Sequence, residues 1–244
     1  MKVLACDAGN SRIKWGLHDG SGWVAQSWVG TAQADQLGEA WRGLPPPDAL
    51  IASNVAGDRV GEALRSAARA LGARLEIIGS RARQCGVRSS YDDPAQLGPD
   101  RWAALIGAWH LCGGPSVVVN AGTTMTADAL SRDGVFLGGV IVAGVDLMRE
   151  TLARSTAGLN MEEGHYTFFP ATTADAIMSG AINALAGTIE RMQRFMREAG
   201  EANPRIVLSG GAAPAVERAL NGGVEVVDNL VLEGLLRIAL ETEK

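Results

Sequence analysis

Two short segments of this 244-residue chain combine glycine with hydroxyl, amide and carboxylate side chains. The first runs from Asp7 to Lys14 and the second from Asn120 to Thr124, and each follows an apolar run typical of a strand. A strand that ends in such a turn presents backbone N–H groups and oxygen ligands around one point. Two turns of this kind can hold the phosphates of a nucleoside triphosphate together with its magnesium ion.

The residue types of the first turn suit phosphate and magnesium chemistry. Gly9 lets the backbone approach a phosphate closely. Asn10 and Ser11 can donate hydrogen bonds, Asp7 can hold hydrated Mg²⁺, and Lys14 can reach a terminal phosphate. An ordinary hairpin with Gly-Asn at its turn explains this segment equally well. A third glycine-bearing turn, Ser209 to Gly211, also follows a predicted strand and favours the phosphate interpretation.

A carboxylate at the start of a predicted helix is the second candidate for chemistry. Asp100 follows Gly98 and Pro99 and begins a helix predicted over residues 100–112, where the helix dipole favours an ionised carboxylate. Such a group can orient an attacking hydroxyl during phosphoryl transfer. A helix cap is the alternative role for an aspartate at this place, and the residues alone leave both roles open.

The elements that must position these residues follow the same order twice. Residues 1–30 predict three short strands, and then helices alternate with buried strands as far as Gly79. The helices are predicted over 33–43 and 57–72, and a loop spans 80–100. From Ser116 a second three-stranded meander begins, and it is followed by helices at 145–154 and 173–199 and by further strands and helices to the end. We therefore predict an approximate architectural duplication that is joined near residues 113–115.

Composition and charge exclude several other classes of protein. With 47% hydrophobic residues the chain can bury a substantial core, and its net charge of −5 opposes binding to a polyanion. No apolar run reaches the length of a membrane-spanning helix, and the N-terminus does not resemble a signal peptide. The three cysteines and three histidines lack the spacing of a disulfide framework or a zinc site. We expect a cytoplasmic protein whose partners include no nucleic acid and no membrane.

Seven segments of the chain resemble the type III pantothenate kinase family in their order and approximate spacing. They are DAGNSRIKWGL, YDDPAQLGPDRW, VVNAGTTMTAD, GGVIVAG, TTADAIMSG, SGG and LEGL, and together they cover essentially the whole chain. Gly98 to Arg101 is the most discriminating element, because it resembles the Gly-x-Asp-Arg element of the family. The first turn alone is shared by all actin-like phosphotransferases.

The resemblance implies an α/β fold of duplicated actin-like (ribonuclease H-like) domains, each a five-stranded mixed sheet with flanking helices. Residues 1–113 would carry the phosphate turn and the substrate loop. Residues 114–244 would carry the second phosphate turn, the adenosine region and the dimer contacts, with ATP in the cleft. The implied enzyme is a cytoplasmic homodimer that phosphorylates pantothenate to 4'-phosphopantothenate with ATP, the first step of coenzyme A biosynthesis.

The same resemblance assigns roles to individual residues. Asp100 matches the catalytic aspartate that accepts the proton of the attacking hydroxyl, and Arg101 suits the pantothenate carboxylate or a phosphate. The implied ATP-binding residues are Asp7, Ala8, Gly9, Asn10, Ser11, Arg12, Ile13, Lys14 and Thr123. The implied substrate-binding residues are Tyr91, Gly98, Pro99, Asp100, Arg101 and Thr173.

The implied cofactors are Mg²⁺ with ATP, held by Asp7, and a monovalent cation, K⁺ or NH₄⁺. Asn120 lies in the region of the monovalent cation, at a position where the family usually has aspartate. Because this change removes a hard anionic ligand, a cation site there is expected to be weaker or differently built. Thr172 and Ala143 also replace residues common in the family, asparagine and proline.

Two other functions stay open. One is an accessory regulatory protein of transcription with weak or no kinase activity, as some relatives of the family have been described. An acidic chain without a helix-turn-helix pattern argues against direct contact with DNA. The other is a different actin-like small-molecule kinase, such as a sugar kinase, against which the Gly98 to Arg101 element and the small size argue.

Overall fold

The computed structural model describes residues 1–156 and 162–242 and divides the chain into two compact units. The first unit is Met1–Cys112 with Asn229–Lys244, and the second is Gly113–Asp228. The chain passes from the first unit to the second between Cys112 and Gly113. The end of the expected second half, 114–244, differs from this division, because the last helix, α7 (Leu230–Thr242), packs against α3 (Pro99–Cys112) of the first unit.

The first unit is built on a five-stranded mixed sheet of order β3-β2-β1-β4-β5. The strands are β1 (Val3–Ala8), β2 (Arg12–His18), β3 (Trp23–Gly30), β4 (Ala49–Asn54) and β5 (Arg74–Ile77). The first three form an antiparallel meander, whereas β4 and β5 add in parallel. The meander and the two buried strands confirm the prediction from sequence.

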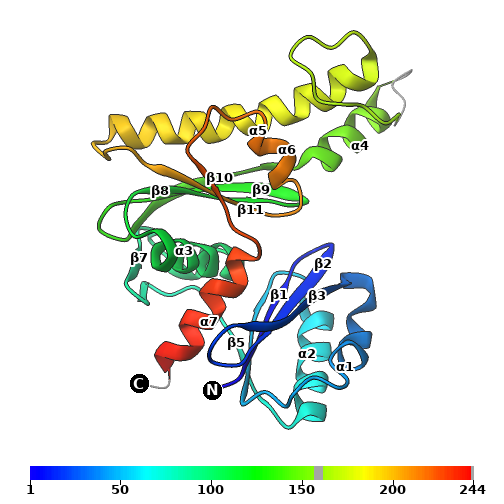
Figure 1. The fold of residues 1–244 in the computed structure, drawn as a ribbon, viewed down its shortest axis with the longest axis vertical. Coiled ribbons are helices and arrows are strands. Elements are labelled where there is room, and N and C mark those ends of the chain that lie inside the picture. The colour runs from blue at the N-terminus through cyan, green and yellow to red at the C-terminus, as the bar shows by residue number, and fades with distance from the viewer. Residues whose placement is uncertain (157–161, 243–244) are drawn as a thin grey trace. The chain divides into compact units, whose positions relative to one another are not determined.

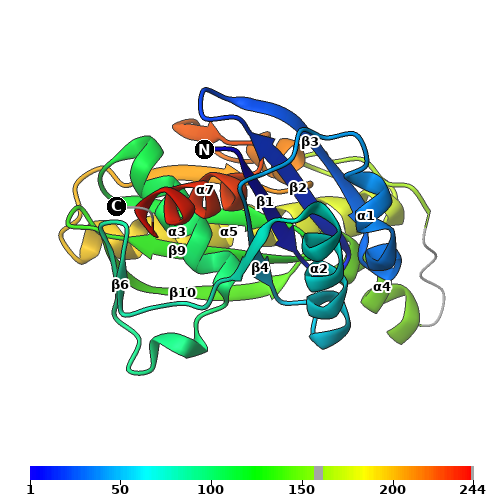
Figure 2. The same ribbon diagram turned by 90° about the horizontal axis from the view of Figure 1, so that it is seen from below.

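Helix α2 (Asp58–Leu71) covers one face of this sheet, next to the short helix α1 (Leu37–Ala40), as Figures 1 and 2 show. The apolar stripe of α2 includes Val60 and Leu64, which pack on alternate residues of β1 and β2. Helix α2 ends at Gly72, whose φ of 63° is the left-handed conformation that favours glycine at this place. This helix and its end were predictable from the spacing of apolar residues.

Two predictions for the first unit are wrong in detail. The helix predicted over 33–43 is a 3-10 segment, η1 (Thr31–Gln36), followed by only one turn of α1, because no side chain caps it and Gly38 weakens it. The loop predicted over 80–100 contains a small hairpin of β6 (Arg83–Gln84) and β7 (Val87–Ser89), followed by a second 3-10 turn, η2 (Pro94–Gln96). Its two-residue turn, Cys85-Gly86, has positive φ at both positions.

The second sheet has seven strands in the order β12-β11-β8-β9-β10-β7-β6, rather than the five predicted, and the first five of this order belong to the second unit. These strands are β8 (Ser116–Ala121), β9 (Thr124–Leu130), β10 (Val135–Ala143), β11 (Arg205–Ser209) and β12 (Val224–Val226). Strands β8, β9 and β10 form the predicted second meander, and β11 and β12 add in parallel. The two units therefore share one strand arrangement, as the duplication requires.

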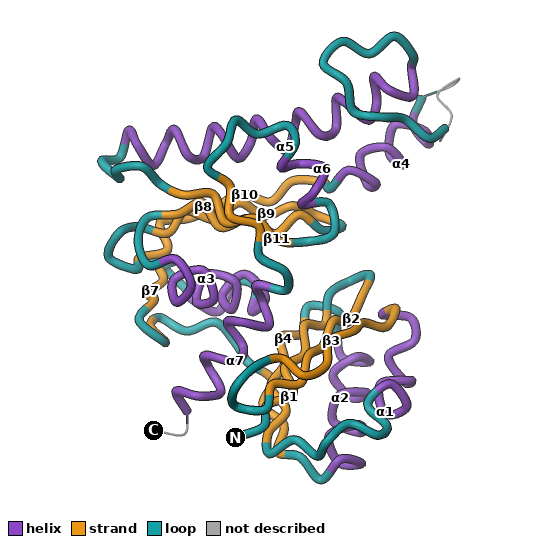
Figure 3. Tube along the Cα trace, in the orientation of Figure 1, coloured by secondary structure: helices purple, strands orange, loops and turns teal. Residues whose placement is uncertain are grey.

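Three helices accompany this second sheet: α4 (Val145–Ser155), α5 (Thr173–Glu198) and α6 (Ala213–Glu217). The long helix α5 lies along the sheet, as Figure 3 shows in purple above orange strands. It buries Leu185, Ile189 and Met196 against β8, β9 and β11. No helix among the described residues is long and apolar enough to cross a membrane.

Candidate active site

Hydrogen bonds within the first glycine turn and from Thr31 hold its backbone in place. The Gly9 N–H donates to the Arg12 carbonyl oxygen over 3.1 Å, which closes the turn between β1 and β2. Thr31, directly after β3, fixes the turn from the other side, because its N–H donates to the Ser11 carbonyl oxygen and its hydroxyl to the Gly9 carbonyl oxygen. Asn10, Ser11 and Arg12 are exposed, so the turn is rigid and accessible to a ligand.

One face of the first sheet carries the polar side chains that follow this turn. Strand pairing places Ser53, Asp7, Lys14 and Trp28 in a single row across β4, β1, β2 and β3. Residues in one row share a face because side chains alternate along a strand. The opposite face holds the apolar core with α2, including Cys6, Ile13 and Trp15. The end of this face next to the turn is therefore polar, although Val3 and Ala5, farther along β1 on the same face, are buried.

Asp7 is the central group of this row. The Ser53 hydroxyl donates to Asp7 Oδ1 over 2.8 Å, and Ser53 itself is fully buried. Loss of water raises the pKa of Asp7 from 3.8 to about 6. The Ser53 hydrogen bond and the positive charge of Lys14 oppose this shift, and the negative charge of Asp100 adds to it. A partly buried carboxylate with this raised pKa is well suited to hold a cation.

Asp100 lies in the first turn of α3, within electrostatic reach of Asp7. Its side chain folds back over Gly98, where an added Cβ would come within 2.6 Å of Asp100 Oδ1. The loop before it is anchored by the Ser80 hydroxyl, which donates to the Leu97 carbonyl oxygen over 2.8 Å. Gly98 therefore leaves room for this orientation of Asp100, and the structure brings Lys14 and Asp100 within electrostatic reach of Asp7.

The other predicted substrate residues lie on both units. Arg101 is buried, with only 7% of its surface exposed, and Tyr91 is half-buried after β7, where its N–H donates to the Ser89 hydroxyl. In the second unit, Thr173 is the exposed first residue of α5. Thr172 caps that helix by accepting a hydrogen bond from the Asp175 N–H. For all three predicted residues, contact with a substrate remains a prediction.

The second glycine turn is packed between the two other glycine segments of its unit. An added Cβ on Gly144 would lie 2.2 Å from the Gly122 carbonyl oxygen, and one on Gly210 would lie 2.4 Å from the Ala121 carbonyl oxygen. The Gly144 N–H also donates to the Thr123 carbonyl oxygen over 2.9 Å. Backbone approaches this close exclude any side chain, so these glycines fix the conformation of the turn. Thr123 itself is exposed.

Asn120 holds in the second unit the place that Asp7 holds in the first. Asn120 pairs with Ser209 and Thr126 across β11, β8 and β9, as Asp7 pairs with Ser53 and Lys14 across β4, β1 and β2. The burial patterns of β1 and β8 are also the same. The two glycine turns are therefore structural counterparts, and the second lacks the carboxylate of the first.

Three residues near the first turn could not be predicted from the sequence: Ser53, Thr31 and Trp28. Each owes its place to strand pairing across β1, β2, β3 and β4, which the order of residues does not specify. The only signal was that Ser53 falls at the end of a predicted strand, as Asp7 does.

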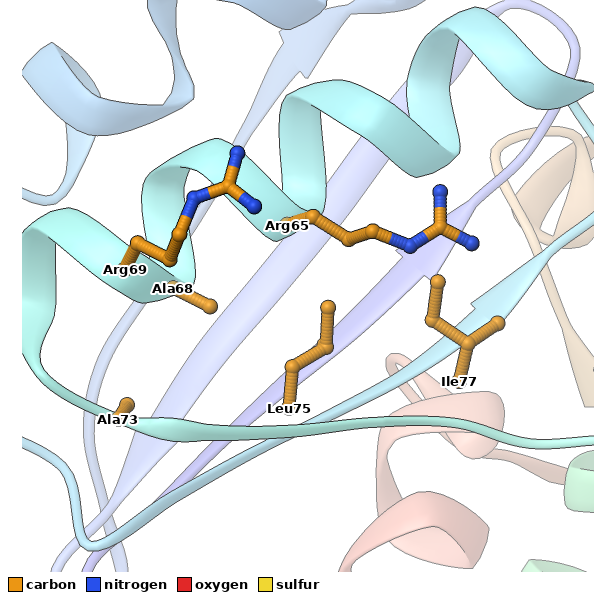
Figure 4. A pocket seen from close by; sticks show the side chains of 6 residues that line it. All are labelled: Arg65, Ala68, Arg69, Ala73, Leu75 and Ile77. Carbon is orange, nitrogen blue, oxygen red and sulfur yellow. The ribbon is translucent and has the colours of Figure 1, made fainter.

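A surface groove of about 420 Å³ lies elsewhere in the first unit, between α2 and β5. Figure 4 shows its lining, which consists of Arg65, Ala68, Arg69, Ala73, Leu75 and Ile77. It includes none of the predicted site residues, so the groove is not part of the candidate active site.

The described residues contain no cluster of three or more His, Cys, Asp or Glu side chains that could hold a metal ion. Mg²⁺ in phosphoryl-transfer enzymes is usually bound by one or two carboxylates together with substrate phosphates. Asp7, a partly buried carboxylate at the phosphate turn, fits that kind of site.

A family model described as type III pantothenate kinase matches residues 3–194 of the chain. The chain is 46% identical over 242 residues to the type III pantothenate kinase of Nitrosospira multiformis, a match that covers 99% of this chain and 92% of that protein. It is 47% identical over 239 residues to the type III pantothenate kinase of Aromatoleum aromaticum, with 98% of each covered.

Among solved structures, the chain resembles a candidate 2-dehydro-3-deoxygalactonokinase from Sinorhizobium meliloti, with a TM-score of 0.62. That match covers 98% of this chain and 99% of the other, at 16% identity. A likeness at this identity concerns the fold alone. It confirms the predicted fold class, an actin-like α/β fold with two mixed sheets and flanking helices, although the sheets have five and seven strands rather than five each.

Proposed function

This chain belongs to the type III pantothenate kinase family and therefore phosphorylates pantothenate in coenzyme A biosynthesis, and we propose that ATP is its phosphoryl donor and Asp100 its catalytic carboxylate. The strongest support for these roles is that Asp7 lies within electrostatic reach of both Lys14 and Asp100 in the first unit. A phosphate turn and a carboxylate that can orient a hydroxyl are the two parts that phosphoryl transfer needs.

In the proposed reaction the primary hydroxyl oxygen of pantothenate attacks the γ-phosphorus of ATP. The bond between that phosphorus and the β–γ bridging oxygen breaks, and ADP leaves. Asp100 accepts the hydroxyl proton, which then passes to solvent. Asp100 lies in the first turn of α3, and its side chain folds back over Gly98, which leaves room for this orientation.

The remaining predicted residues complete the proposal. The nucleotide phosphates bind the turn from Asp7 to Lys14 in the first unit and Thr123 in the second. Pantothenate contacts Tyr91, Thr173 and the Gly98 to Arg101 segment, where the guanidinium of Arg101 pairs with the substrate carboxylate.

Two cations belong to the proposal. Mg²⁺ would be held by Asp7 and the nucleotide phosphates, where it would neutralise negative charge on the phosphates. A monovalent cation, K⁺ or NH₄⁺, is assigned to the region of Asn120. Because Asn120 replaces the carboxylate found at the counterpart position Asp7, that cation is expected to bind weakly there.

A homodimer and a cytoplasmic location are also proposed. Several large apolar side chains of the second unit are exposed, among them Phe168 at 82%, Phe169 at 95% and Ile141 at 60%, and a second copy of the chain would cover such surface. The three cysteines are free thiols, as is usual in a reducing compartment. The net charge of −5 supports the absence of a nucleic-acid partner.

The proposed function is tested by coupled ADP release with pantothenate, with 4'-deoxypantothenate and with a panel of sugars, each with and without K⁺ or NH₄⁺. Of these acceptors, we expect only pantothenate to give ADP release, and we expect a faster rate when the monovalent cation is present. The deoxy analogue controls for turnover that does not use the primary hydroxyl. Release of ADP with a sugar but not with pantothenate would contradict the proposal.

A further inference from the structure

The guanidinium of Arg12 lies over the indole ring of Trp28 in the first unit. The distance from the Arg12 guanidinium carbon to the ring centroid is 4.4 Å, within the range of a cation–π contact. Both side chains are exposed, and Trp28 leaves 53% of its surface open. A large aromatic residue this exposed on an antiparallel strand calls for an explanation beyond packing.

Strand pairing places this stack on the polar face of the sheet. Trp28 pairs directly with Lys14, and Arg12 precedes Lys14 by two residues, so all three side chains share the face that carries Asp7. The stack therefore belongs to the same surface as the row of Ser53, Asp7 and Lys14.

The charge of Arg12 is available for a ligand. Among the residues that the structure describes, Arg12 forms no ion pair with a carboxylate, and its contact is with Trp28. By contrast, Arg59, which donates to the Thr31 carbonyl oxygen next to the same turn, is paired with Asp35. A guanidinium that stacks on an aromatic face keeps its N–H donors free at its edge, in the fork that matches phosphate oxygens.

Strand β3 also supports the phosphate turn itself. Thr31 follows Trp28 by three residues, and its N–H and hydroxyl hold the carbonyl oxygens of Ser11 and Gly9. One short segment thus fixes both the backbone of the turn and the side chain of Arg12. A cation whose position is set before binding loses less conformational entropy when the ligand arrives.

We propose that Trp28 is a positioning residue for nucleotide binding, which holds the Arg12 guanidinium at the phosphate turn so that it can pair with the terminal phosphates of ATP. This inference rests on the proposed use of ATP and adds to it a role for an aromatic side chain that never touches the reacting atoms. Arg12 is the group that contacts the phosphate, and Trp28 acts through Arg12.

The experiment compares W28A and W28F with the wild type by steady-state kinetics, with V24A as a matched control. Val24 lies on the same strand, at the register irregularity opposite Leu17 and His18, and is 54% exposed, but it pairs with neither Arg12 nor Lys14. We expect W28A to raise KM for ATP about two- to five-fold, the range for an exposed cation–π contact, and to leave KM for pantothenate unchanged. W28F should recover most of the affinity, and V24A should behave as wild type.

A double-mutant cycle with R12A separates this role from a structural one. If Trp28 acts through Arg12, W28A has no further effect on KM for ATP once Arg12 is alanine. An unchanged KM in W28A, an equal rise in both KM values, or the same effect of W28A in the R12A background would overturn the inference.

Direct binding of the non-hydrolysable ATP analogue AMP-PNP, followed by calorimetry without pantothenate, keeps the inference separate from the proposed function. Wild-type chain that binds AMP-PNP but does not turn over pantothenate would contradict the proposed function alone. In that case weaker AMP-PNP binding by W28A, with recovery in W28F, still supports the role of Trp28, and equal binding by wild type and W28A refutes it.

Discussion

At the scale of single residues, Asp7 carries a conflict between stability and function. Its carboxylate is partly buried, and loss of water together with the charge of Asp100 raises its pKa to about 6. The folded chain therefore binds a proton at Asp7 more tightly than the unfolded chain, whose aspartate has a pKa near 3.8. Ionisation of Asp7 lowers the stability of the fold as pH rises from about 4 to about 6, and the cost persists above that pH.

The variant D7N tests this conflict. Asparagine keeps an oxygen that accepts the Ser53 hydrogen bond but carries no charge. We expect its Tm at pH 7.5 to exceed that of the wild type by about 2–8 °C, as a gain of about 1–2 kcal/mol gives in a chain of this size. The difference should shrink toward pH 4, and turnover with Mg²⁺ and ATP should be lost. Differential scanning calorimetry from pH 4 to 8 checks the first point, and a Tm equal to or below that of the wild type at pH 7.5 would contradict it.

Part of the candidate site could be predicted from residue types alone. Asp7 to Lys14 and Asp100 stand in local patterns whose chemistry is visible in the sequence, and the structure brings Asp7, Lys14 and Asp100 together. Ser53, Thr31 and Trp28 could not be found in this way. They reach the site through the pairing of β4 with β1 and of β3 with β2. A shift of one residue in the strand register would move their side chains to the opposite face of the sheet.

At the scale of elements, the crossing of α3 and α7 depends on two glycines. An added Cβ at Gly234 would lie 1.7 Å from the Ala103 carbonyl oxygen, and one at Gly107 would lie 2.6 Å from the Leu230 carbonyl oxygen. Both obstacles are backbone atoms, which cannot move aside as a flexible side chain can. The two helices can therefore approach this closely only with glycine at both positions.

We expect G234A to force α3 and α7 apart and to lower the stability of the first unit by about 3 kcal/mol or more, which lowers Tm by about 6–12 °C. G187A is the matched control, because Gly187 is exposed within α5 and an added Cβ there meets nothing within 4 Å. That change should raise stability slightly, since alanine favours helix more than glycine does. Thermal unfolding followed by circular dichroism distinguishes the two variants, and a similar Tm for both would rule out the close crossing.

Long periodic elements were predictable, and short ones were not. Helices α2 and α5 have clear apolar stripes, and the structure bounds each within one residue of the predicted ends. The hairpin of β6 and β7 has only two and three residues in its strands, too few for an alternating pattern to appear. Its turn needs positive φ at Cys85, which a cysteine rarely adopts, so the sequence carries little sign of it.

At the scale of the whole molecule, the chain leaves its first unit after Cys112 and returns to it at Asn229. The second meander begins at a recognisable strand, which is why the sequence predicts a joint near residues 113–115. The predicted second half, 114–244, includes the last helix because a prediction from sequence keeps contiguous residues in one unit. The return of the chain to the first unit follows from the packing of α7 on α3 across their glycines, and this packing is visible only in the structure.

The central claim concerns Asp100, which the first unit presents beside its phosphate turn. The variant D100N is compared with D58N, because Asp58 is likewise an aspartate in the first turn of a helix of the same unit but has no proposed role. Measured as kcat for ADP release with pantothenate, D100N is expected to be slower by about 10²- to 10⁴-fold with an unchanged Tm, while D58N retains wild-type kcat. A kcat near that of the wild type in D100N would contradict the catalytic role and leave Asp100 as a helix cap.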